Sequence, residues 1–200
     1  MELLIGIVIL VFSAILHEIA HGYVADKLGD PTARIAGRLT LNPIPHIDPI
    51  MSIAVPLLLI LSHSPIVFGA AKPVPVNPLM LHEGRKDIAL VALAGPLTNL
   101  FLALVAALAI KLIGPMLPDL IPVFTIIVFY NLALGFLNLL PVPPLDGSKF
   151  FSIILPEKTA QQYFAIAPFG IFILFLLLLA TPVGNYLNLL IMNSLRLLGL

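Results

Sequence analysis

Two long runs of uncharged, mostly apolar residues decide what this chain can fold into. The first covers 23 residues from Ile88 to Ile110, and the second covers 21 residues from Leu120 to Leu140. A helix needs about 20 apolar residues to cross the ~30 Å hydrocarbon layer of a bilayer. Inside that layer every backbone amide and carbonyl must be paired within the protein, which a helix achieves by itself. Both runs are therefore predicted to be membrane-spanning helices.

The composition of the whole chain agrees with this prediction. Of the 200 residues, 60% are hydrophobic and 10% are charged, against about 45–50% and about 25% in ordinary globular domains. Ten basic residues balance ten acidic ones, so there is no basic surface for nucleic acid, and we expect no nucleic-acid partner. The lack of cysteine excludes disulfides, a thiolate nucleophile and cysteine-bound metal. We expect an all-α polytopic membrane protein that contacts the lipid bilayer.

Further hydrophobic segments bring the expected number of helices to five or six. The N-terminal run 3–24 follows an acidic residue rather than a basic region, so we expect a retained span and not a signal peptide. Residues 164–180, together with the residues just before them, are long enough to cross the bilayer, and we expect a span there. The tail 183–200 places asparagines and an arginine along one helical stripe, so an interfacial helix and a final span both remain open.

The region between the first two helices differs from a spanning helix. Residues 34–41 alternate apolar and polar side chains, which predicts a short β-strand. The apolar run that starts at 50 is interrupted after 12 residues by the Ser-His-Ser-Pro sequence at 62–65. Such a broken run favours a membrane-associated re-entrant element over 50–71, although a full crossing stays open. Residues 72–78 then form a proline-rich connector.

A His-Glu-x-x-His pattern lies in the second half of the N-terminal helix, at His17, Glu18 and His21. Residues four apart share one face of a helix, so both imidazoles are able to bind one metal ion with Glu18 beside it. The alternative is a polar patch on a helix surface. Ionisable side chains inside a membrane span are costly and mark functional sites, which favours a metal site.

A hydrolytic zinc site has three protein ligands and one open position, so a third ligand is needed. Asp146 stands out among the remaining acidic residues because it follows the uncharged run that ends at Leu140 and precedes Gly147. The prolines between Leu140 and Asp146 prevent a regular helix there, and Gly147 permits a sharp turn back toward the helices. A polar turn at the membrane surface is the alternative interpretation.

Three motifs together resemble the site-2 protease family of intramembrane zinc metalloproteases. They are His17-Glu-Ile-Ala-His21, Ala94-Gly95-Pro96 followed by Asn99, and Asn138-x-x-Pro-x-Pro-x-Leu-Asp146-Gly147. The similarity covers about residues 13–150 and is closest to small prokaryotic members without accessory domains. It implies one Zn²⁺ per chain held by His17, His21 and Asp146, with Glu18 as general base and Asn138 as a second catalytic residue near the scissile carbonyl.

The resemblance also implies an activity. The expected function is hydrolysis of peptide bonds within or next to transmembrane segments of membrane-protein substrates, in regulated intramembrane proteolysis. We treat 1–200 as a single domain, with a catalytic core at about 1–150 and C-terminal hydrophobic helices at 160–200. Nothing in the sequence indicates an oligomer.

Simpler interpretations stand beside some of these assignments. Asn99, Gly95 and Pro96 are candidates for substrate binding, but an asparagine in a span is also typical of an interhelical hydrogen bond, and Gly-Pro of a kink with close packing. Asn131 is expected only to pack. The alternatives to a protease are a metal-binding membrane transporter and a non-catalytic scaffold that binds helices. Glu18 favours the protease, because hydrolysis uses a base there and transport does not require one.

The expected metal ligands also constrain the topology. If 50–71 is re-entrant, three crossings bring the first helix and Asp146 to one face of the membrane. A full crossing would place them on opposite faces. The re-entrant arrangement also gathers eight basic residues on one side, so the positive-inside rule places the active site toward the cytoplasm of a cell-membrane protein. The strand expected at 34–41 is a candidate edge for holding an unwound substrate segment.

Overall fold

The computed structural model describes residues 2–62 and 71–200, and these residues form helices and connecting loops without a β-strand. The α-helices are α1 (Glu2–Lys27), α2 (Thr32–Ile35), α3 (Val55–Leu61), α4 (Arg85–Ile113), α5 (Ile121–Asn138), α6 (Asp146–Phe151), α7 (Glu157–Phe164), α8 (Gly170–Ala180) and α9 (Val183–Leu198). A π-helical turn at Pro49–Ala54 leads directly into α3. Short 3-10 turns lie at Ile44–His46, Pro78–Met80, Pro118–Leu120, Ser152–Ile154 and Ala167–Phe169.

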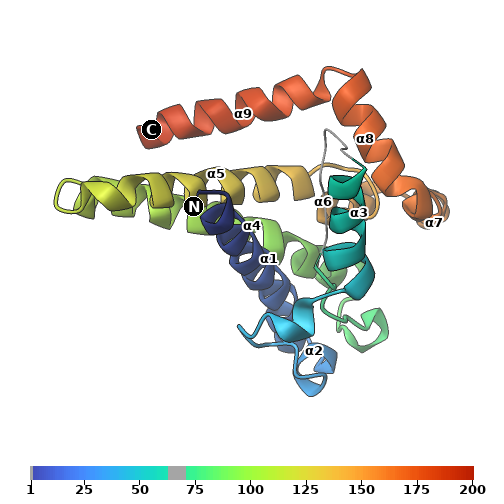
Figure 1. Ribbon diagram of the computed structural model, residues 1–200. Helices are drawn as coiled ribbons and strands as arrows, with labels where there is room; N and C mark the ends of the chain where they lie inside the picture. The colour runs from blue at the N-terminus through green and yellow to red at the C-terminus, as the bar shows by residue number, and fades with distance from the viewer. Residues whose placement is uncertain (1, 63–70) are drawn as a thin grey trace.

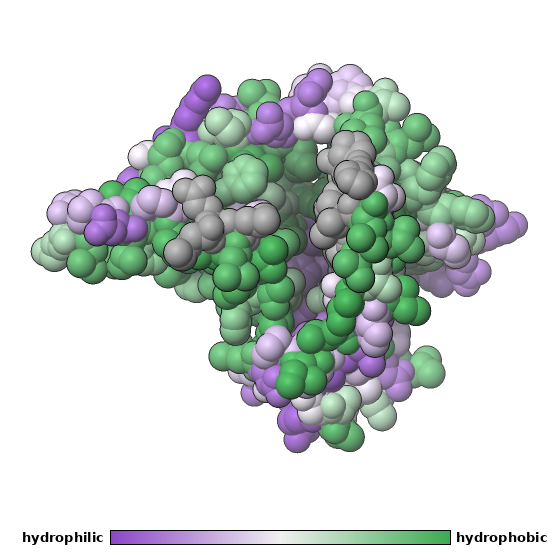
Figure 2. All heavy atoms as spheres, in the orientation of Figure 1, coloured by the Kyte–Doolittle hydropathy of each residue, from purple (hydrophilic) through white to green (hydrophobic). Residues whose placement is uncertain are grey.

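Within the described residues, four helical segments are long and apolar enough to cross a membrane. They are Leu4–Lys27, Arg85–Ile113, Pro118–Asn138 and Glu157–Ala180. The two uncharged runs that anchor the sequence argument therefore lie in spanning helices, as predicted. Most of their side chains face outward, and Figure 2 shows hydrophobic residues over much of the visible surface with polar residues gathered near its ends. The chain is a multi-pass membrane protein.

Helices α4 and α5 form a hairpin and lie side by side, and α1 crosses them (Figure 1). Small residues allow this close approach, because at Gly135 of α5 an added Cβ would lie 2.9 Å from a methyl carbon of Leu100. Helix α9 packs on α5 and contributes the buried Ile191 to an apolar cluster. The other buried members of that cluster are Ala103, Ala106, Ala107, Val128 and Leu132.

The β-strand predicted over 34–41 is wrong. The Asp30 carboxylate accepts the backbone N–H of Thr32 at 3.0 Å and also the Thr32 hydroxyl, which starts the helical turn α2. Gly37 follows with a positive φ of 65° and ends that turn. Arg38 then points inward and is 7% exposed. The alternating pattern thus reflects a turn and a buried arginine, and the proposed substrate edge at 34–41 is lost with the strand.

The proline-rich connector has no helix or strand over residues 71–77 and is anchored at both ends. Near its start, Arg38 donates to the carbonyl oxygens of Lys72 at 2.7 Å and Pro73 at 3.3 Å. At its other end, the Asn77 backbone N–H donates to the Asp30 carboxylate at 2.6 Å. Asp30 and Arg38, which lie before and after α2, therefore fix the path of this segment.

The chain between residues 46 and 72 returns to the place where it starts. The Lys72 backbone N–H donates to the carbonyl oxygen of His46 at 2.8 Å. Residues 63–70, which belong to this stretch, lie outside the described residues. The re-entrant interpretation of 50–71 therefore stays a prediction, and it agrees with this closed path.

Candidate metal centre

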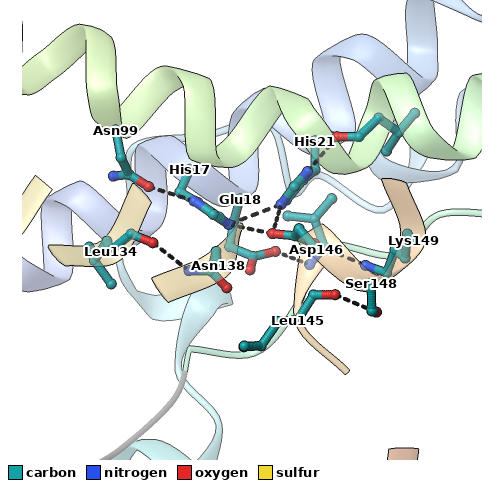
Figure 3. Close-up of polar contacts among 12 residues, drawn as sticks. His17, Glu18, His21, Asn99, Leu134, Asn138, Leu145, Asp146, Ser148 and Lys149 are labelled. Atoms are coloured by element: carbon teal, nitrogen blue, oxygen red, sulfur yellow. Dashed lines mark hydrogen bonds and ion pairs between the residues drawn. The ribbon is translucent and has the colours of Figure 1, made fainter. Parts of the chain in front are cut away.

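Three side chains from distant parts of the chain converge on one point (Figure 3). His17 Nε2, His21 Nε2 and Asp146 Oδ2 lie 3.0 Å from one another. Each of the three residues is between 6% and 7% exposed. Tetrahedral zinc with bonds of about 2.0–2.1 Å sets its ligand atoms roughly 3.3 Å apart. Two imidazole nitrogens and one carboxylate oxygen at this spacing fit a zinc ion and leave one coordination position open.

The local sequence explains how these groups meet. His17 and His21 are four residues apart in α1 and share one face of it. Asp146 begins α6, after a proline-rich loop that ends α5. Gly147 lets this loop fold back tightly, because an added Cβ would lie only 2.2 Å from the Leu139 carbonyl oxygen. The carboxylate is thereby turned toward α1.

Both imidazoles are held from behind through their other ring nitrogen. His17 Nδ1 lies 2.6 Å from Asn99 Oδ1, and His21 Nδ1 lies 2.7 Å from the carbonyl oxygen of Val91. Both partners are oxygens, so each Nδ1 carries the hydrogen and donates it. The Nε2 lone pairs are then free for a metal, which is the arrangement that metal-binding histidines require.

Gly95 of α4 provides the space for the metal. An added Cβ at this position would lie 2.5 Å from Nε2 of His17 and 2.5 Å from Nε2 of His21. Any larger residue would therefore fill the position toward which the ring nitrogens point. Gly95, Pro96 and Asn99 are all buried, and Asn99 contacts His17. Their predicted roles in substrate binding stay predictions.

Glu18 lies beside the three ligands and is held by the connector. Its Oε2 accepts the backbone N–H of Val74 at 2.7 Å. Glu18 is prominent in the sequence as part of the His-Glu-x-x-His pattern, whereas Val74 is not. One signal was present, because Pro73 and Pro75 have no N–H and Val74 supplies the single backbone donor of that three-residue stretch.

Asn138 is the last residue of α5 and is half-buried. Its Nδ2 donates to the Leu134 carbonyl oxygen at 3.0 Å, and Figure 3 shows it on the same side of the metal ligands as Glu18. This position is compatible with the catalytic role expected of Asn138, which stays a prediction.

The second oxygen of Asp146 pairs with a lysine that we did not single out from the sequence. Lys149 Nζ lies 3.1 Å from Asp146 Oδ1, one helical turn later. The positive charge of Lys149 favours the ionised form of the Asp146 carboxyl. Asp146 is therefore ready to bind a cation as the carboxylate.

Comparison with known proteins agrees with a zinc-dependent protein. Residues 115–179 match the model of peptidase family M50. The chain is 38% identical over 188 residues to "Putative zinc metalloprotease YwhC" of Bacillus subtilis (strain 168), which covers 90% of this chain and 82% of that protein.

Two proteins named "Putative zinc metalloprotease Rip2" are more distant. The one from Mycobacterium tuberculosis (strain ATCC 25618 / H37Rv) is 33% identical over 178 residues, covering 87% of this chain and 66% of the relative. The one from Mycolicibacterium smegmatis (strain ATCC 700084 / mc(2)155) is 31% identical over 191 residues, covering 90% and 70%. No solved structure matches the chain.

Proposed function

The chain belongs to peptidase family M50, the site-2 protease family, and on that basis we propose that it cleaves peptide bonds within or next to transmembrane segments of membrane-protein substrates. It is a zinc metalloprotease. One observation carries the proposal: the His17, His21 and Asp146 cluster lies among helices that are apolar enough to cross a bilayer. A site beside such helices would be within reach of peptide bonds in or next to membrane-embedded segments.

The residues around the cluster divide the work of hydrolysis. His17, His21 and Asp146 would hold the zinc ion, which when bound would supply Lewis acidity that lowers the pKa of a water to about 7 and polarises the scissile carbonyl. Glu18 takes the proton from the attacking water and later gives it to the leaving amine nitrogen. The bond from Val74 occupies one lone pair of Oε2, so we assign the proton-accepting role to Oε1. We assign Asn138 to a contact near the scissile carbonyl.

The substrate must be unwound before it is cut, because the carbonyls of a helix are already hydrogen-bonded and its backbone is shielded. We propose that cleavage takes place on the cytoplasmic side, which the distribution of basic residues favours. The proposal treats the chain as one catalytic domain that acts in regulated intramembrane proteolysis.

The experiment is zinc analysis of the purified protein in detergent, paired with cleavage of model transmembrane substrates, for wild type and Glu18→Gln. Glu83→Gln is the matched control, because Glu83 is exposed and pairs with Lys86 on the protein surface. We expect one zinc in all three proteins and cleavage by wild type and the control alone. If all three bind zinc and none cuts a panel of spans, the proposed cleavage of transmembrane segments is wrong.

A further inference from the structure

A series of hydrogen bonds between buried polar side chains leads to His17, one of the expected metal ligands. Ser13 Oγ accepts from Asn131 Nδ2 at 2.9 Å, Asn131 Oδ1 accepts from Asn99 Nδ2 at 2.8 Å, and Asn99 Oδ1 accepts from His17 Nδ1 at 2.6 Å. These residues come from three different helices, α1, α4 and α5. Asn99 and Asn131 are both 0% exposed, and Ser13 is 4% exposed.

Two fully buried amides in an apolar bundle are costly unless each polar atom is paired. Here they are paired. Asn99 Nδ2 also donates to the Ser13 carbonyl oxygen at 3.3 Å, and Asn131 Nδ2 also donates to the Ile127 carbonyl oxygen at 2.9 Å. The contacts account for both amide groups, which suits a defined role better than simple packing.

The same contacts fix which atom of Asn99 faces the histidine. If the Asn99 amide were reversed, its oxygen would face the Ser13 carbonyl oxygen and the Asn131 oxygen, and no hydrogen would lie between them. The network therefore presents an acceptor to His17 Nδ1. A histidine that donates from Nδ1 keeps Nε2 unprotonated for the metal.

We propose that Asn131 and Ser13 act through Asn99 as a positioning network, which holds His17 in the Nδ1–H tautomer with Nε2 directed at the metal. This inference rests on the proposed metal site. His21 offers a contrast, because its Nδ1 is held by the backbone oxygen of Val91 and not by a side chain. Metal affinity should thus depend on buried amides through His17 alone.

The test measures zinc affinity by chelator competition in the purified full chain, with no substrate present. We expect Asn99→Ala and Asn131→Ala to weaken zinc binding by about 10–100-fold, the usual effect of losing a partner of a metal ligand. The absorption spectrum of the Co²⁺-substituted protein should change as well, because it reports ligand geometry. Asn99→Asp should bind zinc much more tightly than Asn99→Ala, since a carboxylate also accepts from Nδ1.

Thr125→Val is the matched control, because the Thr125 hydroxyl donates to the Ile121 carbonyl oxygen within the same helix α5. It should leave zinc affinity and the cobalt spectrum unchanged. If the alanine variants fold and keep both at wild-type values, the proposal is overturned. If they do not fold, Ser13→Ala is the deciding variant, because it removes only the hydroxyl that accepts from Asn131. Zinc affinity and a cobalt spectrum equal to wild type in Ser13→Ala would overturn the proposal.

These readouts do not depend on proteolysis. A wild-type protein that binds zinc and cuts no substrate would refute the proposed function, yet the loss of affinity in Asn99→Ala would still support the network. Cleavage by wild type together with unchanged zinc binding in the variants would refute the network alone.

Discussion

The Val74 backbone N–H donates a 2.7 Å hydrogen bond to the carboxylate of Glu18, which precedes it by 56 positions. Glu18 lies on a spanning helix, whereas Val74 lies on a connector held by Arg38 and Asp30. The orientation of the expected base is thus set by a segment outside the long helices. Movement of this connector would change the orientation of the Glu18 carboxylate, while His17, His21 and Asp146 are held by other contacts.

Replacing Val74 by proline removes the N–H that holds Glu18. We expect kcat to fall by about tenfold or more, since a well-placed general base contributes roughly 10²–10⁴ to the rate. Zinc content should stay at the wild-type value, because no ligand is changed. Val74→Ala is the control, as it trims the side chain and keeps the N–H. A Val74→Pro protein with zinc bound and kcat equal to that of Val74→Ala would contradict the role of this bond.

A methyl group at position 95 should interfere with the metal directly. In Gly95→Ala the new Cβ would lie 2.5 Å from Nε2 of both histidines, so we expect a folded protein with little or no zinc. Gly6→Ala is the comparison, because its nearest atom is the tip of the Tyr130 side chain at 3.1 Å. Metal analysis and circular dichroism check both variants. Full zinc loading of Gly95→Ala would show that the ion binds elsewhere.

Loss of the Asp146 carboxylate should weaken zinc binding more than loss of its partner Lys149. Asp146→Ala is expected to weaken zinc binding by more than about 100-fold, beyond the 10–100-fold typical of residues that only support a ligand. Lys149→Ala, which affects only the contact to Oδ1, should have the smaller effect. Chelator competition measures both, with exposed Asp119→Asn as control. Equal affinities for the Asp146 and Lys149 variants would remove Asp146 from the ligand set.

Asp30 should make stability depend on pH. Burial raises the pKa of Asp30, but hydrogen bonds from Thr32 and Asn77 outweigh it, so the folded-state pKa is lowered. A lowered pKa stabilises the folded protein above the ordinary value of about 3.9 and ceases to do so as pH falls through the folded-state value. Asp30→Asn should therefore lose about 1–3 kcal/mol at pH 7 and progressively less at acid pH. Unfolding in detergent at pH 7, 4 and 3 checks this, and a constant difference would contradict it.

The spanning helices and the pairing of His17 with His21 could be predicted from the sequence because both depend on local rules. Hydrophobic length identified the spans, and helical spacing placed His17 beside His21. The observed helix α4 is longer than the uncharged run 88–110, since it includes charged residues at both ends that hydrophobicity does not register. Asp146 stands out by its place after the second uncharged run, and the family resemblance favours it as the third ligand; the structure brings it to the two histidines.

The remaining features depend on contacts between distant segments, which periodicity does not contain. Asn131 was expected only to pack, but its hydrogen bonds become visible only when α1, α4 and α5 are brought together. The alternation at 34–41 predicted a strand, but the carboxylate of Asp30 starts a helical turn there instead. The conformation of a short segment of this kind depends more on its contacts with the rest of the protein than on its own sequence pattern.

The two histidines expected to bind the metal differ in how a mutation can remove the group that holds each ring. The carbonyl oxygen behind His21 belongs to the backbone of residue 91 and is present whichever amino acid the gene encodes there. The support behind His17 is encoded in side chains, and a single codon change removes any of them. Natural variation in metal affinity should therefore arise from substitutions in the side chains that support His17, whereas the hydrogen bond from His21 to a backbone oxygen does not depend on the side chain at that position.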